Sequence, residues 1–169
     1  MNNFKEIDIL ALNENPFELI GRKWMAICAG DTVKCNAMTA SWGGLGVMWG
    51  KDVAYVVIRP TRYTKEFVDA NRRFALCFLP DSYKKDLSYL GTVSGRDEDK
   101  IAKTGFNLLY DDETPYFEEA FLALFCRKLY AQPFEPGWFI DKSMDPKWYP
   151  EHDYHTLYIA EIDKVLIKK

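Results

Sequence analysis

The stretch CNAMTASWGGLGVMWGKDVAYVVIRPTRYTKE (residues 35–66) places two strands on either side of a glycine break and ends in a cluster of polar residues. NAMTAS (36–41) alternates side chains as a strand with one inward face does. DVAYVVIR (52–59) is rich in β-branched and aromatic residues and stops at Pro60. A helix is expected after Pro60, with Thr61 or Thr64 as its N-cap.

The rest of the chain continues this strand-rich pattern. Further strands are expected at 22–30, 73–79, 121–132 and 154–167, and short helices at 81–91 and 97–105. The strands do not alternate regularly with helices, and no GxGxxG motif occurs. The sequence therefore predicts a mainly β fold, a closed antiparallel barrel with a few peripheral helices, as one domain over residues 1–169.

Composition excludes several classes of protein. The formal net charge is −3, from 22 basic and 25 acidic residues that are well mixed, which argues against a nucleic-acid surface. The N-terminus lacks the pattern of a signal peptide or anchor, and no apolar run reaches the ~20 residues that span a bilayer. We expect a cytoplasmic protein that contacts no membrane.

The cysteines and histidines give no strong catalytic or metal pattern. Cys28, Cys35, Cys77 and Cys126 form no CxxC, so we interpret them as small buried hydrophobes, although Cys28 and Cys35 lie close enough in sequence to approach across a turn. The only histidines are His152 and His155, in a proline-rich loop without the flanking helix of a zinc motif, so no metal site is predicted.

A possible anion site follows the strand at 52–59. Arg59, Arg62, Tyr63 and Thr64 cluster where this strand ends and a helix begins. Helix starts bind anions through free backbone N–H groups, and arginine matches phosphate oxygens. The alternative is a capped helix with solvated arginines, and the residues alone leave both interpretations open.

A possible site for a flat ring lies just before it. Thr39 and Ser41 share one strand face, the following glycines allow close backbone approach, and Trp42 is large enough to cover a planar ring. The alternative is a barrel strand with a core tryptophan.

Two further groups of residues are candidates. Ser94, Arg96 and Lys100 lie near a helix start, where they form either a surface salt-bridge cluster or a contact to a ligand's phosphate or ribityl chain. His155 precedes the last strand and is either a structural hydrogen-bonded group or a proton or amide contact at a site.

Taken together, NAMTASWGGLG, VAYVVIRPTRYT, GTVSGRDEDKIAKTGF and HTLYIAEI resemble the flavin reductase-like family of FMN-binding split barrels, over roughly residues 20–165. The likeness is strongest to the flavoredoxin and NAD(P)H:FMN oxidoreductase branch. The resemblance implies a split antiparallel β-barrel, usually a homodimer, with FMN bound near the subunit interface.

The resemblance also implies roles for individual residues. The isoalloxazine ring would lie against the segment at 36–42, which comprises Asn36, Met38, Thr39, Ala40, Ser41 and Trp42. The ribityl phosphate would lie at Arg59, Arg62, Tyr63 and Thr64, with a second flavin-side motif at Ser94, Arg96 and Lys100. His155 matches a histidine that lies by the flavin in related reductases, and we assign it the catalytic contact.

The expected activity is therefore electron transfer from NADH or NADPH through FMN to a flavin, a metal ion or a redox protein. The alternative is a flavoredoxin-like electron carrier without its own nicotinamide turnover, and a more distant one is a pyridoxamine-phosphate oxidase or a haem-binding relative. One departure from the family pattern is the long aromatic segment at 132–154, which is expected to form an ordered excursion over a pocket or a partner.

Overall fold

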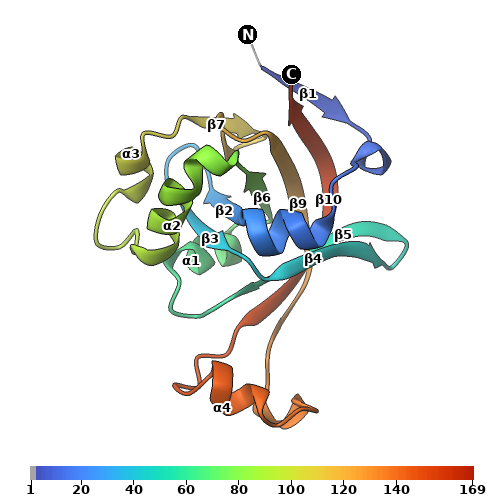
Figure 1. The fold of residues 1–169 in the computed structure, drawn as a ribbon, viewed down its shortest axis with the longest axis vertical. Coiled ribbons are helices and arrows are strands. Elements are labelled where there is room, and N and C mark those ends of the chain that lie inside the picture. The colour runs from blue at the N-terminus through green and yellow to red at the C-terminus, as the bar shows by residue number, and fades with distance from the viewer. Residues whose placement is uncertain (1–2) are drawn as a thin grey trace.

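The computed structural model describes residues 3–169, and its main feature is an eight-stranded antiparallel sheet that curls into a barrel (Figure 1). In sheet order the strands are β3 (Cys35–Ala40), β2 (Met25–Gly30), β6 (Arg73–Phe78), β9 (Leu122–Pro133), β10 (Thr156–Lys168), β5 (Lys51–Ile58) and β4 (Gly43–Met48), with β1 (Phe4–Ile7) paired to β10. The two end strands, β3 and β4, are joined by only Ser41 and Trp42, so the sheet must curl to bring its ends together. The predicted mainly β barrel with peripheral helices is confirmed.

Helices and a small hairpin surround the barrel. The α-helices are α1 (Tyr63–Ala70), α2 (Lys84–Thr92), α3 (Lys100–Thr104) and α4 (Met144–Trp148). Shorter or irregular helical segments are η1 (Ile9–Ala11), η2 (Phe17–Lys23), η3 (Asp81–Tyr83) and η4 (Pro136–Trp138), and β7 (Leu108–Asp111) pairs with β8 (Thr114–Phe117).

The central strands β2 and β6 are buried on both faces, which explains why they are almost entirely apolar. Along β6, Phe74, Leu76 and Phe78 join one buried cluster, which also holds residues of α1 and η2. The alternate residues Ala75 and Cys77 join a second cluster with residues of α2, α3 and β8. Because successive side chains of a strand point to opposite faces, these clusters lie on the two sides of the sheet.

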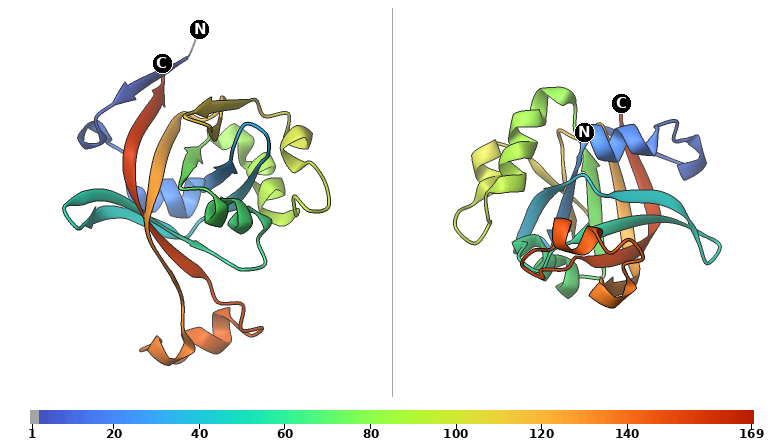
Figure 2. Two further views of the ribbon diagram at one scale, coloured as in Figure 1. Left: turned by 180° about the vertical axis from the view of Figure 1, so that it is seen from behind. Right: turned by 60° about the horizontal axis from the view of Figure 1, so that its bottom comes forward.

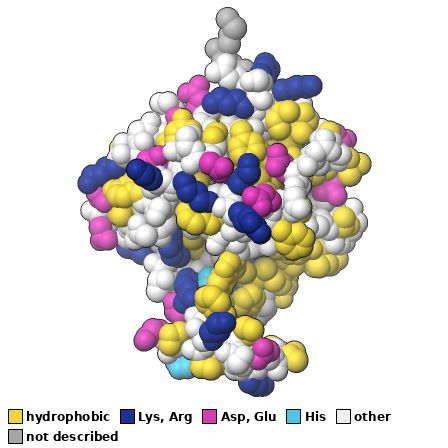
Figure 3. Space-filling model, in the orientation of Figure 1, with side chains coloured by type: hydrophobic (Ala, Val, Ile, Leu, Met, Phe, Trp, Pro, Cys, Tyr) yellow, Lys and Arg dark blue, Asp and Glu magenta, His cyan; other side chains and the backbone are white. Residues whose placement is uncertain are grey.

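β9 and β10 extend beyond the barrel and carry an arm, residues 134–155, that holds η4 and α4 (Figure 2). The arm projects from the barrel in both the front and back views, and Figure 3 shows it as a separate lobe joined by a narrower neck where hydrophobic side chains gather. The ordered excursion expected at 132–154 is therefore confirmed.

Several predicted element boundaries are wrong, each for a local reason. The strand expected at 22–30 begins only at Met25, because Trp24 has φ 70° and follows the helical segment η2. Neither Thr61 nor Thr64 caps α1. Its N-cap is Arg62, and the Thr64 hydroxyl instead accepts a hydrogen bond from Asn36 Nδ2 at 2.9 Å.

The helix expected at 81–91 is also displaced. Its first residues form η3, and α2 then runs past Gly91 to Thr92. Gly91 lies inside the helix instead of ending it, and it packs closely on β3: a Cβ there would lie 3.2 Å from Cβ of Thr39.

The cysteines behave as buried thiols. Cys28, Cys77 and Cys126 are buried, as predicted, whereas Cys35 is half-buried. Cys28 Sγ lies 3.8 Å from Cys77 Sγ, and the Cys35 sulfur faces the Tyr110 hydroxyl at 4.0 Å. Cys28 and Cys35 lie on the paired strands β2 and β3 and pack in the same cluster, and both are free thiols. Burial raises the pKa of the Cys28 thiol, which makes it a poor nucleophile.

Within residues 3–169, no helix combines the length and the apolar character needed to cross a bilayer.

Candidate functional site

The candidate site consists of two neighbouring hollows at one end of the barrel, and Arg62 lines both of them. The larger, which we call the ring hollow, has a volume of about 230 Å³ and is lined by Met38, Thr39, Ala40, Ser41, Trp42, Val57, Arg59, Arg62, Trp148 and His155. The smaller, the anion hollow, has a volume of about 140 Å³ and is lined by Thr61, Arg62, Tyr63, Thr64, Thr92, Val93, Ser94, Gly95 and Lys100. The structure thus brings the predicted segments at 38–42, 62–64 and 94–100 to one place.

Arg62 has an unsatisfied donor in this site. Its Nη1 donates to the Gly91 carbonyl at 2.8 Å, but its Nη2 is buried and has no hydrogen-bond partner. Burial of the guanidinium lowers its pKa. A buried guanidinium nitrogen without an acceptor is costly, so an anionic ligand that supplied one would be strongly favoured.

Lys100 adds a second buried cation beside Arg62. Lys100 is only 3% exposed, and its Nζ donates to the carbonyls of Leu90 and Val93 at 2.8 and 3.0 Å. Burial, with a smaller contribution from the charge of Arg62, lowers the pKa of Lys100 to about 8. These carbonyls at the end of α2 orient the amine, but they do not cancel its charge.

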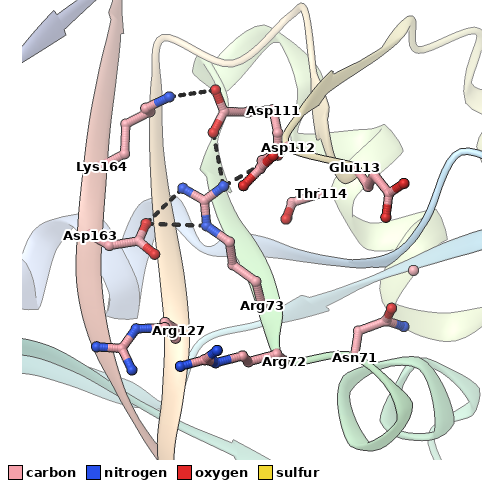
Figure 4. Close-up of a pocket in the computed structure, with 11 residues that line it drawn as sticks. Asn71, Arg72, Arg73, Asp111, Asp112, Glu113, Thr114, Arg127, Asp163 and Lys164 are labelled. Carbon is pink, nitrogen blue, oxygen red and sulfur yellow. Dashed lines mark hydrogen bonds and ion pairs between the residues drawn. The ribbon is translucent and has the colours of Figure 1, made fainter.

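A larger cavity provides a contrast, because its Arg73 is already paired with two aspartates. It has a volume of about 610 Å³ and lies between the β7–β8 hairpin and the sheet. Figure 4 shows Arg73 there between Asp111 and Asp163, at 2.8 and 2.6 Å, with Lys164 also bonded to Asp111. Among residues 3–169, no carboxylate forms such a pair with Arg62 or Lys100, so the anion hollow is lined by two cations without a carboxylate partner.

The start of α1 completes the anion hollow. The first turn of a helix leaves backbone N–H groups without intrahelical acceptors, and the Arg62 side chain does not cap them. Asn36 supports this turn from behind through its bond to Thr64, and Gly95 packs so closely on Asn36 that a Cβ there would lie 3.0 Å from Asn36 Cγ. Hydroxyl, amide and cationic donors therefore converge on one small hollow, which suits a phosphate group.

The ring hollow is built by the last residues of β3 and by aromatic side chains. Trp42 packs edge-to-face on Trp148 of the arm, with ring centroids 4.9 Å apart. The Thr39 hydroxyl donates to the Leu87 carbonyl at 2.5 Å, which fixes this end of β3 against α2. Backbone groups and small side chains thus face one side of the hollow, and aromatic rings form its wall.

His155 stands at the arm side of the ring hollow as an uncharged imidazole. Its Nδ1 lies 2.8 Å from the Tyr149 hydroxyl, and its ring centroid lies 5.3 Å from that of Trp42. Burial, followed by the nearby charge of Arg59, lowers the pKa of His155 to about 4. At neutral pH this side chain therefore offers a hydrogen bond rather than a charge.

Two predicted arginines lie apart from the anion hollow. The Arg59 guanidinium reaches toward the arm, where Nη1 bonds both oxygens of Asp153 at 2.5 and 2.6 Å. Arg96 is exposed, pairs with Glu66, and lies with its Cζ 4.7 Å from the centroid of the Tyr63 ring. Arg59 lines the ring hollow, whereas Arg96 contributes to neither hollow.

Sequence reasoning missed Val57, Thr61, Thr92, Val93, Gly95 and Trp148 as lining residues. Thr61 and the segment at 92–95 adjoin predicted residues, so widening each motif by a few positions would have found them. Trp148 had no such signal, because it comes from the arm and is more than one hundred positions from Trp42.

Comparisons with known proteins identify the family of this chain. The family model described as "Flavin reductase like domain" matches residues 21–169. An FMN-binding domain of a flavin reductases-like enzyme from Shewanella baltica superposes with a TM-score of 0.71 at 18% identity, covering 99% of this chain and 78% of that one. Flavoredoxin from Methanosarcina acetivorans gives a TM-score of 0.68 at 22% identity, covering 94% and 75%.

A third solved structure, an NADH:FAD oxidoreductase from Streptomyces globisporus, gives a TM-score of 0.62 at 14% identity and covers 86% of this chain and 81% of that one. No curated protein matches the chain at a significant level. The family model covers nearly the whole sequence and the structural matches share its barrel. This chain therefore belongs to the flavin reductase-like family.

Proposed function

We propose that this chain binds FMN and acts as a flavin-dependent oxidoreductase. The observation that carries the proposal is the buried Lys100 next to Arg62, whose buried Nη2 has no hydrogen-bond partner, beside a hollow walled by aromatic rings. A flavin with a terminal phosphate presents a planar ring and a dianion at opposite ends, which matches these two hollows. The FMN named for several of the similar structures supports the same ligand.

Each set of residues has a role in this account. Arg62, Lys100, Tyr63, Thr64 and Ser94 bind the phosphate, while Asn36 holds Thr64 in place. The residues of β3 from Met38 to Ala40, with Ser41, present backbone and hydroxyl groups to the polar edge of the ring, and Trp42 and Trp148 exclude water from its side. His155 donates or accepts one hydrogen bond at the free nitrogen of its ring. When bound, a flavin supplies the hydride and electron transfer that no side chain here performs.

The electron donor that we propose is NADH or NADPH, with free flavin, a metal ion or a redox protein as acceptor. The family and the NADH:FAD oxidoreductase from Streptomyces globisporus support a nicotinamide donor.

A flavoredoxin-like electron carrier is the second candidate, and the position of Trp148 favours it. This ring lines the hollow from the arm side and packs on Trp42, which narrows the space in which a nicotinamide would stack. A carrier that exchanges electrons through the ring edge needs no such space. The flavoredoxin from Methanosarcina acetivorans provides a structural precedent.

Anaerobic reduction distinguishes the two candidates. The purified protein is loaded with FMN, and its visible absorbance is followed after adding NADH or NADPH in separate experiments. We expect rapid bleaching by at least one nucleotide. A flavin that bleaches only with dithionite contradicts the oxidoreductase and leaves the carrier.

We also propose a homodimer, because the arm exposes large apolar side chains that a second subunit would cover. Trp138 and Ile140 are 78% and 93% exposed, near an apolar hollow of about 490 Å³ lined by Phe134, Phe139 and their neighbours. Sedimentation should give twice the chain mass of 19.7 kDa. A single chain mass at micromolar concentration contradicts the dimer.

A further inference from the structure

Arg59 directly follows β5. The sequence alone predicts that it binds a phosphate together with Arg62, but in the structure its side chain contacts the arm. Besides the two bonds from Nη1 to Asp153, its Nη2 donates to the Trp148 carbonyl at 2.7 Å. Its Cζ also lies 5.1 Å from the centroid of the Tyr149 ring. All of these partners belong to one short segment of the arm, residues 148–153.

The positive charge of Arg59 is consequently already neutralised. The ion pair with Asp153 is largely shielded, with side-chain exposures of 27% and 20%. Because both carboxylate oxygens and a carbonyl satisfy its guanidinium, Arg59 would have to give up these bonds to bind a phosphate. Arg62, in contrast, has a buried Nη2 without a hydrogen-bond partner, so this nitrogen could bind a phosphate without breaking an existing hydrogen bond.

The segment that Arg59 holds belongs to a self-packed unit. The rings of Phe139, Tyr149 and Tyr154 pack against one another at tilted angles within the arm, with Tyr149 and Tyr154 centroids 5.0 Å apart. The Tyr154 hydroxyl donates to Asp145 at 2.9 Å. A contact at 148–153 therefore fixes the orientation of the arm as a unit, rather than one side chain of it.

Two lining residues of the ring hollow depend on that orientation. Trp148, whose carbonyl accepts a hydrogen bond from Arg59, packs on Trp42, which belongs to the barrel. His155 is bonded to Tyr149, the residue whose ring Arg59 covers. Any shift of the arm relative to β5 would move both side chains away from the barrel half of the hollow.

We propose that Arg59 is a positioning residue that fastens the arm to the barrel, so that Trp148 and His155 shape the ring end of the flavin site while Arg62 and Lys100 hold the phosphate. This role rests on the proposed function only in naming the ligand; the fastening itself is a property of the protein without flavin.

The first experiment compares FMN with riboflavin, which lacks the phosphate. Arg59→Gln should weaken both ligands by a similar factor, about tenfold, because the lost contacts shape the ring hollow. The matched Arg62→Gln variant should weaken FMN far more than riboflavin. Asp153→Asn, which removes no positive charge, should reproduce Arg59→Gln, and the double variant should be no worse than either single one.

Arg59→Lys keeps the charge but loses the planar fork, so its affinities should fall between those of the wild type and Arg59→Gln. The proposal is overturned if Arg59→Gln selectively weakens FMN as Arg62→Gln does. It is equally overturned if Asp153→Asn leaves both affinities unchanged.

A second experiment uses the protein without flavin, so that it remains decisive even if the proposed ligand is wrong. Amide hydrogen exchange of residues 148–155 should accelerate about tenfold in Arg59→Gln and in Asp153→Asn, as expected when a net stabilising bond is lost. Arg62→Gln should leave this segment at the wild-type rate. Unchanged exchange in both Arg59→Gln and Asp153→Asn contradicts the fastening role.

Discussion

Replacing Arg62 by glutamine should weaken FMN binding by roughly 100-fold while changing riboflavin binding by less than about threefold, given the usual strength of buried hydrogen bonds to charged groups. Arg62 Nη2 is a buried donor without a partner, and a phosphate oxygen is the acceptor that it lacks. Riboflavin has the same ring but no phosphate, so it cannot use this donor. The selective loss follows from that difference alone.

Quenching of flavin fluorescence measures both dissociation constants on the same protein. Arg72→Gln is the matched control, because Arg72 is an exposed arginine that lines the cavity of about 610 Å³ and neither hollow of the candidate site. It should leave both ligands unchanged. The melting temperature of each variant without ligand checks that Arg62→Gln still folds after losing its bond to Gly91. Equal losses of FMN and riboflavin in Arg62→Gln would contradict the phosphate role.

FMN affinity should fall as the pH rises above about 8, by up to about tenfold per pH unit, and riboflavin affinity should not. The pKa of Lys100 is lowered to about 8 by its burial and by Arg62, so the free protein loses this charge there. The phosphate of FMN is a dianion at this pH, because its second pKa is about 6. FMN binds more tightly when Lys100 is protonated. Above about pH 8, where the amine of the free protein is neutral, Lys100 must therefore take up a proton when FMN binds.

Lys100→Met provides the control for this profile, since it removes the titrating group and fills a similar volume. We expect weaker FMN binding at pH 7 and a flat response to higher pH. The same slope in Lys100→Met as in the wild type would assign the titration to another group.

The titration of Lys100 should also make the stability of the ligand-free protein depend on pH, but in the opposite direction: its contribution to stability should rise above about pH 8, where FMN affinity falls. The Lys100 amine has its ordinary pKa of 10.5 when unfolded and about 8 when folded, so between these values the unfolded chain binds more protons. Burying this group therefore costs least at high pH, and its contribution to stability improves as the pH rises from about 8. The difference in urea stability between wild type and Lys100→Met isolates this effect from the buried cysteines, whose raised pKa values act in the other direction.

Most of the barrel could be predicted because the residue composition of each strand is itself typical of a β-strand. After their first polar residues, β5 and β6 consist of aliphatic, aromatic and small apolar residues, and each ends two positions before a proline, so the sequence predicts both within a residue or two. β4 was missed because GGLG (43–46) has few side chains to show a pattern. Only Gly43 has a steric reason on the neighbouring strand: its φ is 155°, and a Cβ there would collide with the backbone carbonyl oxygen of Tyr55, whereas a Cβ at Gly44 or Gly46 would make ordinary contact with the Tyr55 ring.

The candidate site was predictable where its residues are contiguous and unpredictable where they meet across the fold. The segments at 38–42 and 62–64 each end a strand or begin a helix, which is a local property. The different directions of Arg59 and Arg62 are not local, because Asp153 lies 94 positions away from Arg59. Two arginines that look equivalent in RPTR thus face different partners.

Titration of the wild-type protein, freed of ligand, with FMN and with riboflavin tests the central claim most directly. If Arg62 and Lys100 bind a phosphate, FMN should bind at least about 100-fold more tightly than riboflavin at pH 7 and low salt. Equal affinities for the two flavins, or binding of neither, would contradict it.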